Sequence, residues 1–214
     1  MSKIDIAFDL THYNEYIGNS IKEVGFVNYR GFLPATQEVR SIFETVKEHC
    51  SNPENILEFG SRFGFSSSYM LDVFPNSTVH AFDIEKPKSR YMSTVPIDAV
   101  INRFQERFVF HHKSSIHVKE HYGKDSFQLA FVDGDHTYEG ALADIKNCID
   151  LNIPYIMIDN HLKMKDIIDR IQAEVKLEFV KEMVYKQWYK PTKINNVWEA
   201  KEDFDSIGFY VLKK

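Results

Sequence analysis

Cysteine is scarce in this chain, and long apolar runs are absent from it. Only Cys50 and Cys148 occur among the 214 residues, far apart and in unrelated contexts. Two such residues make no disulfide framework and are typical of reduced thiols in an intracellular protein. No stretch reaches the roughly 18 consecutive apolar residues that a membrane-spanning helix needs. We therefore expect a soluble protein with no membrane partner.

Export signals and an excess of positive charge are also missing. The N-terminus, "MSKIDIAFDLTHYNEYIG", has neither the apolar core nor the small-residue cleavage site of a secretory signal, which predicts a cytoplasmic location. Lys and Arg number 26 against 31 Asp and Glu, a net charge of -5. Such a balance offers no positive field to phosphate backbones, so we expect no nucleic-acid partner.

The composition that remains is that of a globular domain. Hydrophobic residues make up 43% and charged residues 27% of the chain, without internal repeats or low-complexity runs. This length can bury one substantial core without disulfides or metals. We expect one domain over residues 36–214. Residues 1–35 are rich in Tyr and Phe and fit no alternating pattern, so we expect them to form a cap over the ligand edge.

Apolar runs alternate with helix-compatible segments along most of the chain. Such alternation, with strands that are apolar on both faces, predicts an α/β fold with a doubly wound, mostly parallel Rossmann-like sheet. Two final strand-like runs with no helix between them predict an antiparallel hairpin with a loop at 187–204. The expected strands lie in 56–60, 77–85, 107–115, 126–133, 154–160, 176–188 and 205–214, and the expected helices in 36–50, 66–74, 97–104 and 138–150.

A glycine-containing turn follows the first expected strand in "ILEFGSRFGFSS". Gly60 and Gly64 allow a tight turn and a close ligand approach at a helix N-terminus, although packing alone also explains many such glycines. Asp83 stands 19 residues after Gly64, where an acid typically binds a ribose diol. Glu58 replaces the first glycine of the dinucleotide fingerprint, and a carboxylate there repels pyrophosphate but suits a cationic ligand. The pattern favours S-adenosylmethionine over NAD.

These residues resemble the class I S-adenosylmethionine-dependent methyltransferases, over roughly residues 36–214 including the terminal hairpin. The resemblance implies that the methionine end is lined by Glu58, Gly60, Ser61, Gly64 and Ser66. It also implies that Asp83 holds the ribose hydroxyls and that the loop after the third crossover contacts adenine. An ordinary solvated loop is the alternative for that last segment. The implied cofactor residues are Glu58, Gly60, Ser61, Gly64, Ser66, Asp83, Ser114, Ser115 and Asp133.

Polar side chains follow two expected neighbouring strands. Asp133 ends "FQLAFVD", and Asp159 and Asn160 end "PYIMIDN". Parallel strands deliver their carboxyl ends to one edge of a sheet, so these oxygen donors are expected to converge beside the ligand crevice. Two carboxylates and an amide suit Mg²⁺, or Mn²⁺ or Ca²⁺, and do not suit zinc.

This metal set resembles that of the catechol and caffeoyl-CoA O-methyltransferases, where an acid after the fourth strand and an Asp-Asn pair after the fifth hold the ion. The segment "FVDGDHTYEGALADI" is more similar to the bacterial group that includes sugar and macrolide-type O-methyltransferases. The resemblance implies methyl transfer to a hydroxyl of a small-molecule acceptor of the sugar, phenol or natural-product type. Asp133 then takes part in catalysis as well as in metal and cofactor binding.

One departure from that pattern concerns the general base. The catechol and caffeoyl-CoA enzymes have a lysine three residues after the first metal-binding acid, whereas this chain has His136. Histidine titrates near neutrality and accepts a proton readily, so we interpret His136 as the base. The alternatives are a cap of the following turn or helix, or an outer contact of the metal. His161 is a second candidate.

Other functions remain open at this point. A hydroxylase-like enzyme of the cephalosporin hydroxylase group shares much of the same sequence at the strand ends. A non-catalytic nucleoside-binding module would keep the same binding site. An amino-methylating nucleic-acid enzyme would carry an (Asp or Asn)-Pro-Pro-aromatic motif where this chain has "DGDH". The acceptor cannot be read from the sequence. A homo-oligomer is compatible with it.

Overall fold

The computed structural model describes residues 37–62, 64–84, 95–194 and 197–212. The cap expected over residues 1–35 lies outside these ranges. In the described part of the chain, no helix is both long and apolar enough to cross a bilayer.

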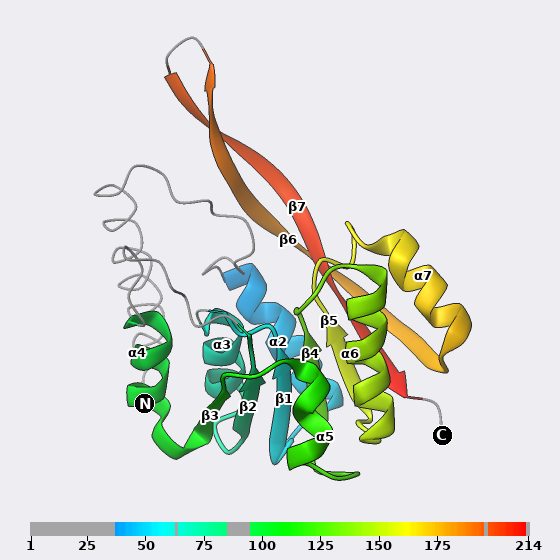
Figure 1. The fold of residues 1–214 in the computed structure, drawn as a ribbon. Helices are drawn as coiled ribbons and strands as arrows, with labels where there is room; N and C mark the ends of the chain where they lie inside the picture. The colour runs from blue at the N-terminus through cyan, green and yellow to red at the C-terminus, as the bar shows by residue number, and fades with distance from the viewer. Residues whose placement is uncertain (1–36, 63, 85–94, 195–196, 213–214) are drawn as a thin grey trace.

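A seven-stranded sheet forms the centre of the fold (Figure 1), in the order β3-β2-β1-β4-β5-β7-β6. Strands β1 to β5 are parallel to one another, while β7 runs antiparallel between β5 and β6. This confirms the predicted doubly wound sheet with a C-terminal antiparallel hairpin. The strands are β1 Asn55–Phe59, β2 Thr78–Phe82, β3 Phe108–His111, β4 Leu129–Val132, β5 Tyr155–Ile158, β6 Leu177–Ile194 and β7 Val197–Leu212.

Helices cover both faces of the sheet, which is why the central strands are apolar on both sides. One face packs against α2, α3 and α4, around Phe43, Met70 and Phe131. The other packs against α5, α6 and α7, around Phe59 and Ile145. The helices are α2 Gln37–His49, α3 Phe65–Val73, α4 Val95–Phe104, α5 Val118–His121, α6 Tyr138–Asp150 and α7 Lys165–Glu174, with 3₁₀ turns η1 Gln105–Arg107 and η2 Ser115–His117.

The parallel register brings three strand ends to one edge. Phe59 pairs with Val132, and Val132 pairs with Ile158. The residues that follow β1, β4 and β5 therefore emerge side by side, which is the position where open α/β sheets bind ligands.

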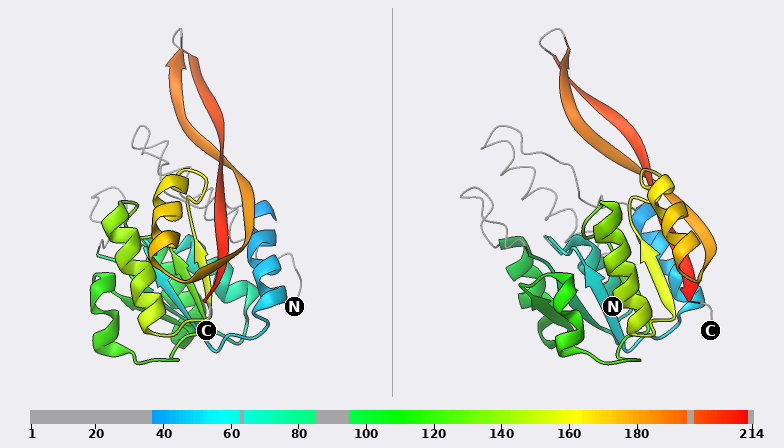
Figure 2. Two further views of the ribbon diagram at one scale, coloured as in Figure 1. Left: turned by 90° about the vertical axis from the view of Figure 1, so that its right-hand side faces the viewer. Right: turned by 45° about the vertical axis from the view of Figure 1, so that its right-hand side comes forward.

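The terminal hairpin is longer than the sequence suggested. A loop was expected at 187–204, but β6 and β7 pair through most of that segment, from Leu177–Leu212 out to Ile194–Val197. The hairpin projects well beyond the sheet (Figure 2). Thr192, Ile194 and Val197 are β-branched and favour strands, and Pro191 lies within a register shift, where a strand tolerates the loss of an N–H donor. The loop prediction was therefore wrong, because pairing between β6 and β7 extends through a segment whose local sequence, apart from these residues, gave little strand signal.

Candidate functional site

A cavity of about 580 Å³ opens at the carboxyl ends of the parallel strands. Five of the residues predicted to bind the cofactor line it, and so does His136. The volume is within the range usual for sites that hold small molecules and cofactors. The lining residues are Phe59, Gly60, Arg62, Phe82, Asp83, Ile84, Lys113, Ser114, Ser115, Ile116, Asp133, Gly134, Asp135, His136, Gly140, Ala143 and Asp144.

Gly60 forms the closest approach between the turn after β1 and the turn after β4. Its φ angle is +88°, and a Cβ atom built on it would lie 1.9 Å from the backbone oxygen of Asp133. No larger residue fits here without moving the backbone. The sequence requirement for glycine at this position thus comes from strand-to-strand packing as well as from ligand access.

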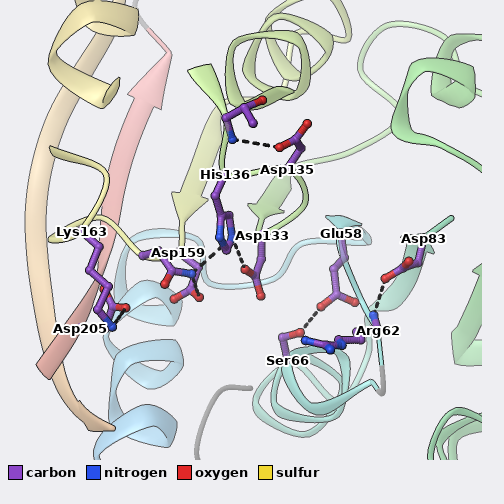
Figure 3. A network of polar contacts seen from close by, with 12 residues as sticks. Glu58, Arg62, Ser66, Asp83, Asp133, Asp135, His136, Asp159, Lys163 and Asp205 are labelled. Atoms are coloured by element: carbon purple, nitrogen blue, oxygen red, sulfur yellow. Dashed lines mark hydrogen bonds and ion pairs between the residues drawn. The ribbon is translucent and has the colours of Figure 1, made fainter. Parts of the chain in front are cut away.

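Asp83 follows β2 at the cavity wall. Its Oδ2 accepts a hydrogen bond from the backbone N–H of Arg62, across 2.6 Å, which ties the end of β2 to the glycine turn (Figure 3). Arg62 itself adopts a left-handed φ of 45°. The predicted ribose-binding carboxylate is therefore held against the turn that would receive the rest of the nucleoside.

Glu58 lies beneath this turn and does not line the cavity. Its side chain has no exposed surface and accepts hydrogen bonds from Ser66 and Ser67 at the start of α3. Burial raises the pKa of Glu58 to about 7, an effect that the serine hydrogen bonds partly oppose. Ser61, Gly64 and Ser66 are also buried and absent from the cavity wall. Of the five predicted methionine-end residues, Gly60 lines the cavity and the other four support the turn from below.

Asp133, Asp159 and Asn160 lie together with His136 at the ends of β4 and β5. His136 Nε2 is 3.2 Å from Asp133 Oδ1 and 3.4 Å from Asn160 Nδ2 (Figure 3), and the same amide donates to Asp159 Oδ2 across 2.8 Å. Burial, together with the neighbouring Glu58 carboxylate, raises the pKa of Asp133 well above its usual range. Burial and the charges of Asp133 and Asp205 do the same for Asp159.

The C-terminal hairpin adds two side chains to this acidic cluster that the sequence did not reveal, and one of them pairs with Lys163. Tyr185 of β6 donates to Asp159 Oδ1 across 3.0 Å. Asp205 of β7 has no exposed surface, and its Oδ2 lies 2.7 Å from the Lys163 ammonium. Local sequence gave no signal for these contacts, because they depend on the register between strands that are distant in the chain.

His161, the second candidate base, lies outside the cavity wall. Its imidazole is buried between Glu182 and Tyr210, with Nδ1 2.9 Å from Glu182 Oε1 and Nε2 2.6 Å from the Tyr210 hydroxyl. Both ring nitrogens therefore have partners within the hairpin, and the ring also stacks on Phe179. The geometry makes His136, which lines the cavity, the better placed of the two histidines.

Asp144 of α6 is a further cavity residue that the sequence analysis missed. Its side chain is almost fully buried, and Asn147 on the same helix donates to the backbone oxygen of Ser115 across 3.3 Å. A signal existed, because Asp144 shares a helical face with the buried Ala141, Ile145 and Cys148. An acid within an apolar helical stripe usually has a specific partner.

Comparisons with known proteins agree with this geometry. Residues 57–158 match the sequence model of a family described as a methyltransferase domain. The family match over just under half of the chain and the shared fold together support a class I S-adenosylmethionine-dependent methyltransferase. A search of curated protein sequences gave no significant match.

Solved methyltransferase structures share the fold at low sequence identity. An O-methyltransferase from Bacillus cereus in complex with S-adenosylhomocysteine has a TM-score of 0.62 at 13% identity, covering 100% of this chain and 93% of that one. The O-methyltransferase TomG from Streptomyces achromogenes, bound to S-adenosylmethionine, has a TM-score of 0.62 at 10% identity, covering 100% and 92%. A proposed RNA methyltransferase from Pyrococcus horikoshii gives 0.63 at 9%, covering 99% of each chain.

Among the described residues, no group of three or more His, Cys, Asp or Glu side chains has an arrangement that could hold a metal ion. The predicted set contains two carboxylates and an amide, and the amide nitrogen of Asn160 faces Asp159. The amide oxygen of Asn160 would face a cation only if the side-chain amide were turned over. The oxygen and the NH₂ group have nearly the same shape, so the same space accommodates either orientation.

Proposed function

We propose that the protein transfers a methyl group from S-adenosylmethionine to a hydroxyl of a small molecule, with the help of a divalent cation. The observation that carries this proposal is that the cavity and the acidic cluster at the ends of β4 and β5 have two residues in common. Asp133 and His136 line the cavity and also belong to the cluster. A donor in the cavity and an acceptor at the cluster would therefore meet.

The residues of the cluster fit a divalent cation. Asp133 and Asp159 are neighbouring carboxylates, and burial together with the charge of Asp133 raises the pKa of Asp159. A cation relieves such like-charge repulsion, and hard oxygen donors are those that Mg²⁺ and Mn²⁺ prefer. Asp133, Asp159 and Asn160 would hold it. When bound, such an ion lowers the pKa of an acceptor hydroxyl and orients its oxygen.

The chain's own residues have three tasks in this reaction. Asp83 would accept hydrogen bonds from the ribose hydroxyls, and the Gly60 turn would let the backbone approach the donor closely. His136 Nε2 would accept the proton that the acceptor hydroxyl loses. Asp133 Oδ1, at 3.2 Å from that nitrogen, would then stabilise the resulting imidazolium. Alignment of donor and acceptor can itself contribute on the order of 7 kcal/mol.

The charge of the chain supports a small-molecule acceptor over a nucleic acid. A net charge of -5 opposes the approach of a phosphate backbone, even though one structural neighbour is a proposed RNA methyltransferase. We further propose that an oxygen atom receives the methyl group, that the reaction requires the metal, and that the protein acts in the cytoplasm.

Calorimetric titration with S-adenosylhomocysteine and with Mn²⁺ tests the two halves of the site separately. Asp83→Ala is expected to lose affinity for the nucleoside and keep that for the metal, whereas Asp159→Ala should show the opposite pattern. Methyl transfer from S-adenosylmethionine to a panel of sugars and phenols, with and without Mg²⁺, then tests turnover. Binding of the nucleoside with no transfer to any acceptor would instead support a binding module.

A further inference from the structure

An ion pair joins the C-terminal hairpin to the turn that follows β5. The ammonium of Lys163 lies 2.7 Å from Asp205 Oδ2, and Asp205 has no exposed surface. Asp205 Oδ1 accepts a hydrogen bond from the backbone N–H of Ser206 across 2.9 Å. Among the buried side chains of the described residues, Asp205 Oδ2 is the one polar atom without a hydrogen-bond donor. The charge of Lys163 is therefore what offsets this oxygen in its buried position.

The pair lies beside the carboxylates of the proposed metal site (Figure 3). Asp205 is directly opposite Tyr185 in the hairpin register, and the Tyr185 hydroxyl donates to Asp159 Oδ1 across 3.0 Å. The charge of Asp205 acts on both Asp133 and Asp159. The described residues contain no group of three acidic or other ligating side chains arranged to hold an ion, so Asp205 is not placed as a third ligand. Its effect on a bound cation would be electrostatic.

Lys163 lies near enough in the chain to reach the metal-binding acids. It follows Asp159 by four residues, and a hydrogen bond of 2.8 Å from the Met164 N–H to the Asn160 oxygen closes a turn over this segment. The lysine side chain is a flexible four-carbon stem that ends in a compact charge, and here it is 31% exposed. An ammonium released from Asp205 would compete with a divalent cation for the buried carboxylates.

We propose that Asp205 holds the ammonium of Lys163 away from the metal-binding carboxylates, and that this pair sets the affinity of the site for a divalent cation. The inference rests on the proposed function, since it takes Asp133 and Asp159 to hold the ion. Asp205 is then a positioning residue, because it acts through Lys163 and contacts neither the cation nor the substrate. Residues outside the ligands themselves commonly change metal affinity by about 10- to 100-fold.

Calorimetric titration with Mn²⁺ at pH 7.5 measures this effect without any acceptor substrate. Asp205→Asn keeps the shape of the side chain and releases Lys163, so we expect the affinity for Mn²⁺ to fall by about tenfold or more. Lys163→Met keeps an apolar stem and removes the charge, so the affinity should rise. The double variant has no lysine to compete with the cation, and its affinity should return to within about threefold of the wild type.

Lys165 and Asp169 provide the matched control. They form an ion pair on α7, and both side chains are exposed, by 62% and 55%. Surface pairs of this kind are screened by solvent, so Lys165→Met and Asp169→Asn should leave the affinity for Mn²⁺ unchanged. Binding of S-adenosylhomocysteine to every variant checks that the rest of the site is intact.

Each outcome separates the inference from the function on which it rests. An Asp205→Asn variant with the wild-type affinity for Mn²⁺ overturns the role of the pair, and so does a double variant that binds Mn²⁺ as weakly as Asp205→Asn. If neither the wild type nor Lys163→Met binds Mn²⁺, the metal of the proposed function and this inference fail together. Thermal unfolding without metal identifies a variant that does not fold, in which case the remaining variants decide.

Discussion

The hydroxyl of Tyr185 on β6 donates a hydrogen bond to Asp159 at the end of β5, across 3.0 Å and past the intervening strand β7. The bond links the outermost strand of the sheet to the proposed metal site. Asp159 is buried beside other carboxylates, so it depends on such donors for its stability in the folded protein.

Tyr185→Phe removes this donor and keeps the ring. We expect the free energy of unfolding to fall by about 1–3 kcal/mol, because a buried carboxylate loses a hydrogen bond. Urea denaturation without metal measures the change. Tyr155→Phe is the control, since Tyr155 stacks on Phe209 on the neighbouring strand and lies at the opposite end of β5. Equal effects of the two substitutions would contradict a specific role for Tyr185.

We expect the free energy of unfolding to depend on pH because of the buried Glu58. Its pKa is raised from 4.5 to about 7 by burial, so folding favours the protonated form. Its contribution is fully present below pH 4.5 and is lost as the pH rises through 7, a change of about 3 kcal/mol. Glu58→Gln keeps the shape and cannot ionise. The stability of the wild type relative to this variant should therefore fall between pH 4.5 and pH 7.5.

Urea denaturation of both proteins at several pH values measures that difference. The Asp159 contribution is present in both proteins and largely cancels. The difference includes the coupling of Glu58 to Asp133, because the Glu58 charge helps to raise the pKa of Asp133 and Glu58→Gln removes that effect. A difference that stays constant over this range would show that Glu58 is ionised throughout.

We expect a single methyl group added at Gly60 to lower the stability of the fold severely. Gly60→Ala would place Cβ 1.9 Å from the Asp133 backbone oxygen at a φ of +88°, so the turns after β1 and β4 must separate. We expect a loss of about 2 kcal/mol or more in the free energy of unfolding, together with weaker nucleoside binding. Gly123→Ala is the matched control, because a Cβ there meets nothing within 4 Å. Similar melting temperatures for the two variants would contradict this.

We expect a substitution of His136 to lower kcat and to have little effect on the binding of S-adenosylhomocysteine. His136→Gln should lower kcat by about 100-fold or more if Nε2 takes the acceptor proton, while affinity for S-adenosylhomocysteine changes little. His49→Gln, in the last turn of α2 and against Phe209, serves as the control. A wild-type kcat in the His136 variant would exclude the imidazole as base, and the measurement is a steady-state methyl-transfer assay.

The convergence at the strand ends could be predicted, because parallel strands of similar length finish at one edge. Asp133 and Asp159 needed only that rule. The position of Glu58 also had a signal in the strand alternation. Ile56 packs on the α3 side of the sheet and Leu57 on the other, so Glu58 returns to the α3 side.

The contributions of the hairpin could not be predicted. The contact between Tyr185 and Asp159 joins residues 26 positions apart, and Lys163 meets Asp205 from a different segment. Both depend on how far β6 and β7 pair, and the sequence suggested a loop over part of that length. Long-range register is set by the assembled sheet and has no counterpart in local propensity.

The insertion of β7 between β5 and β6 has a consequence for biosynthesis. Residues 208–211 are translated after every parallel strand, yet they pair with β5. Asp205 precedes them on the same strand, and its charge acts on Asp159. A nascent chain halted before them could stack its five parallel strands but would leave the outer edge of β5 uncovered. The surroundings of Asp159 are therefore complete only when synthesis has passed Asp205, so a prematurely terminated product should accumulate as an aggregation-prone species.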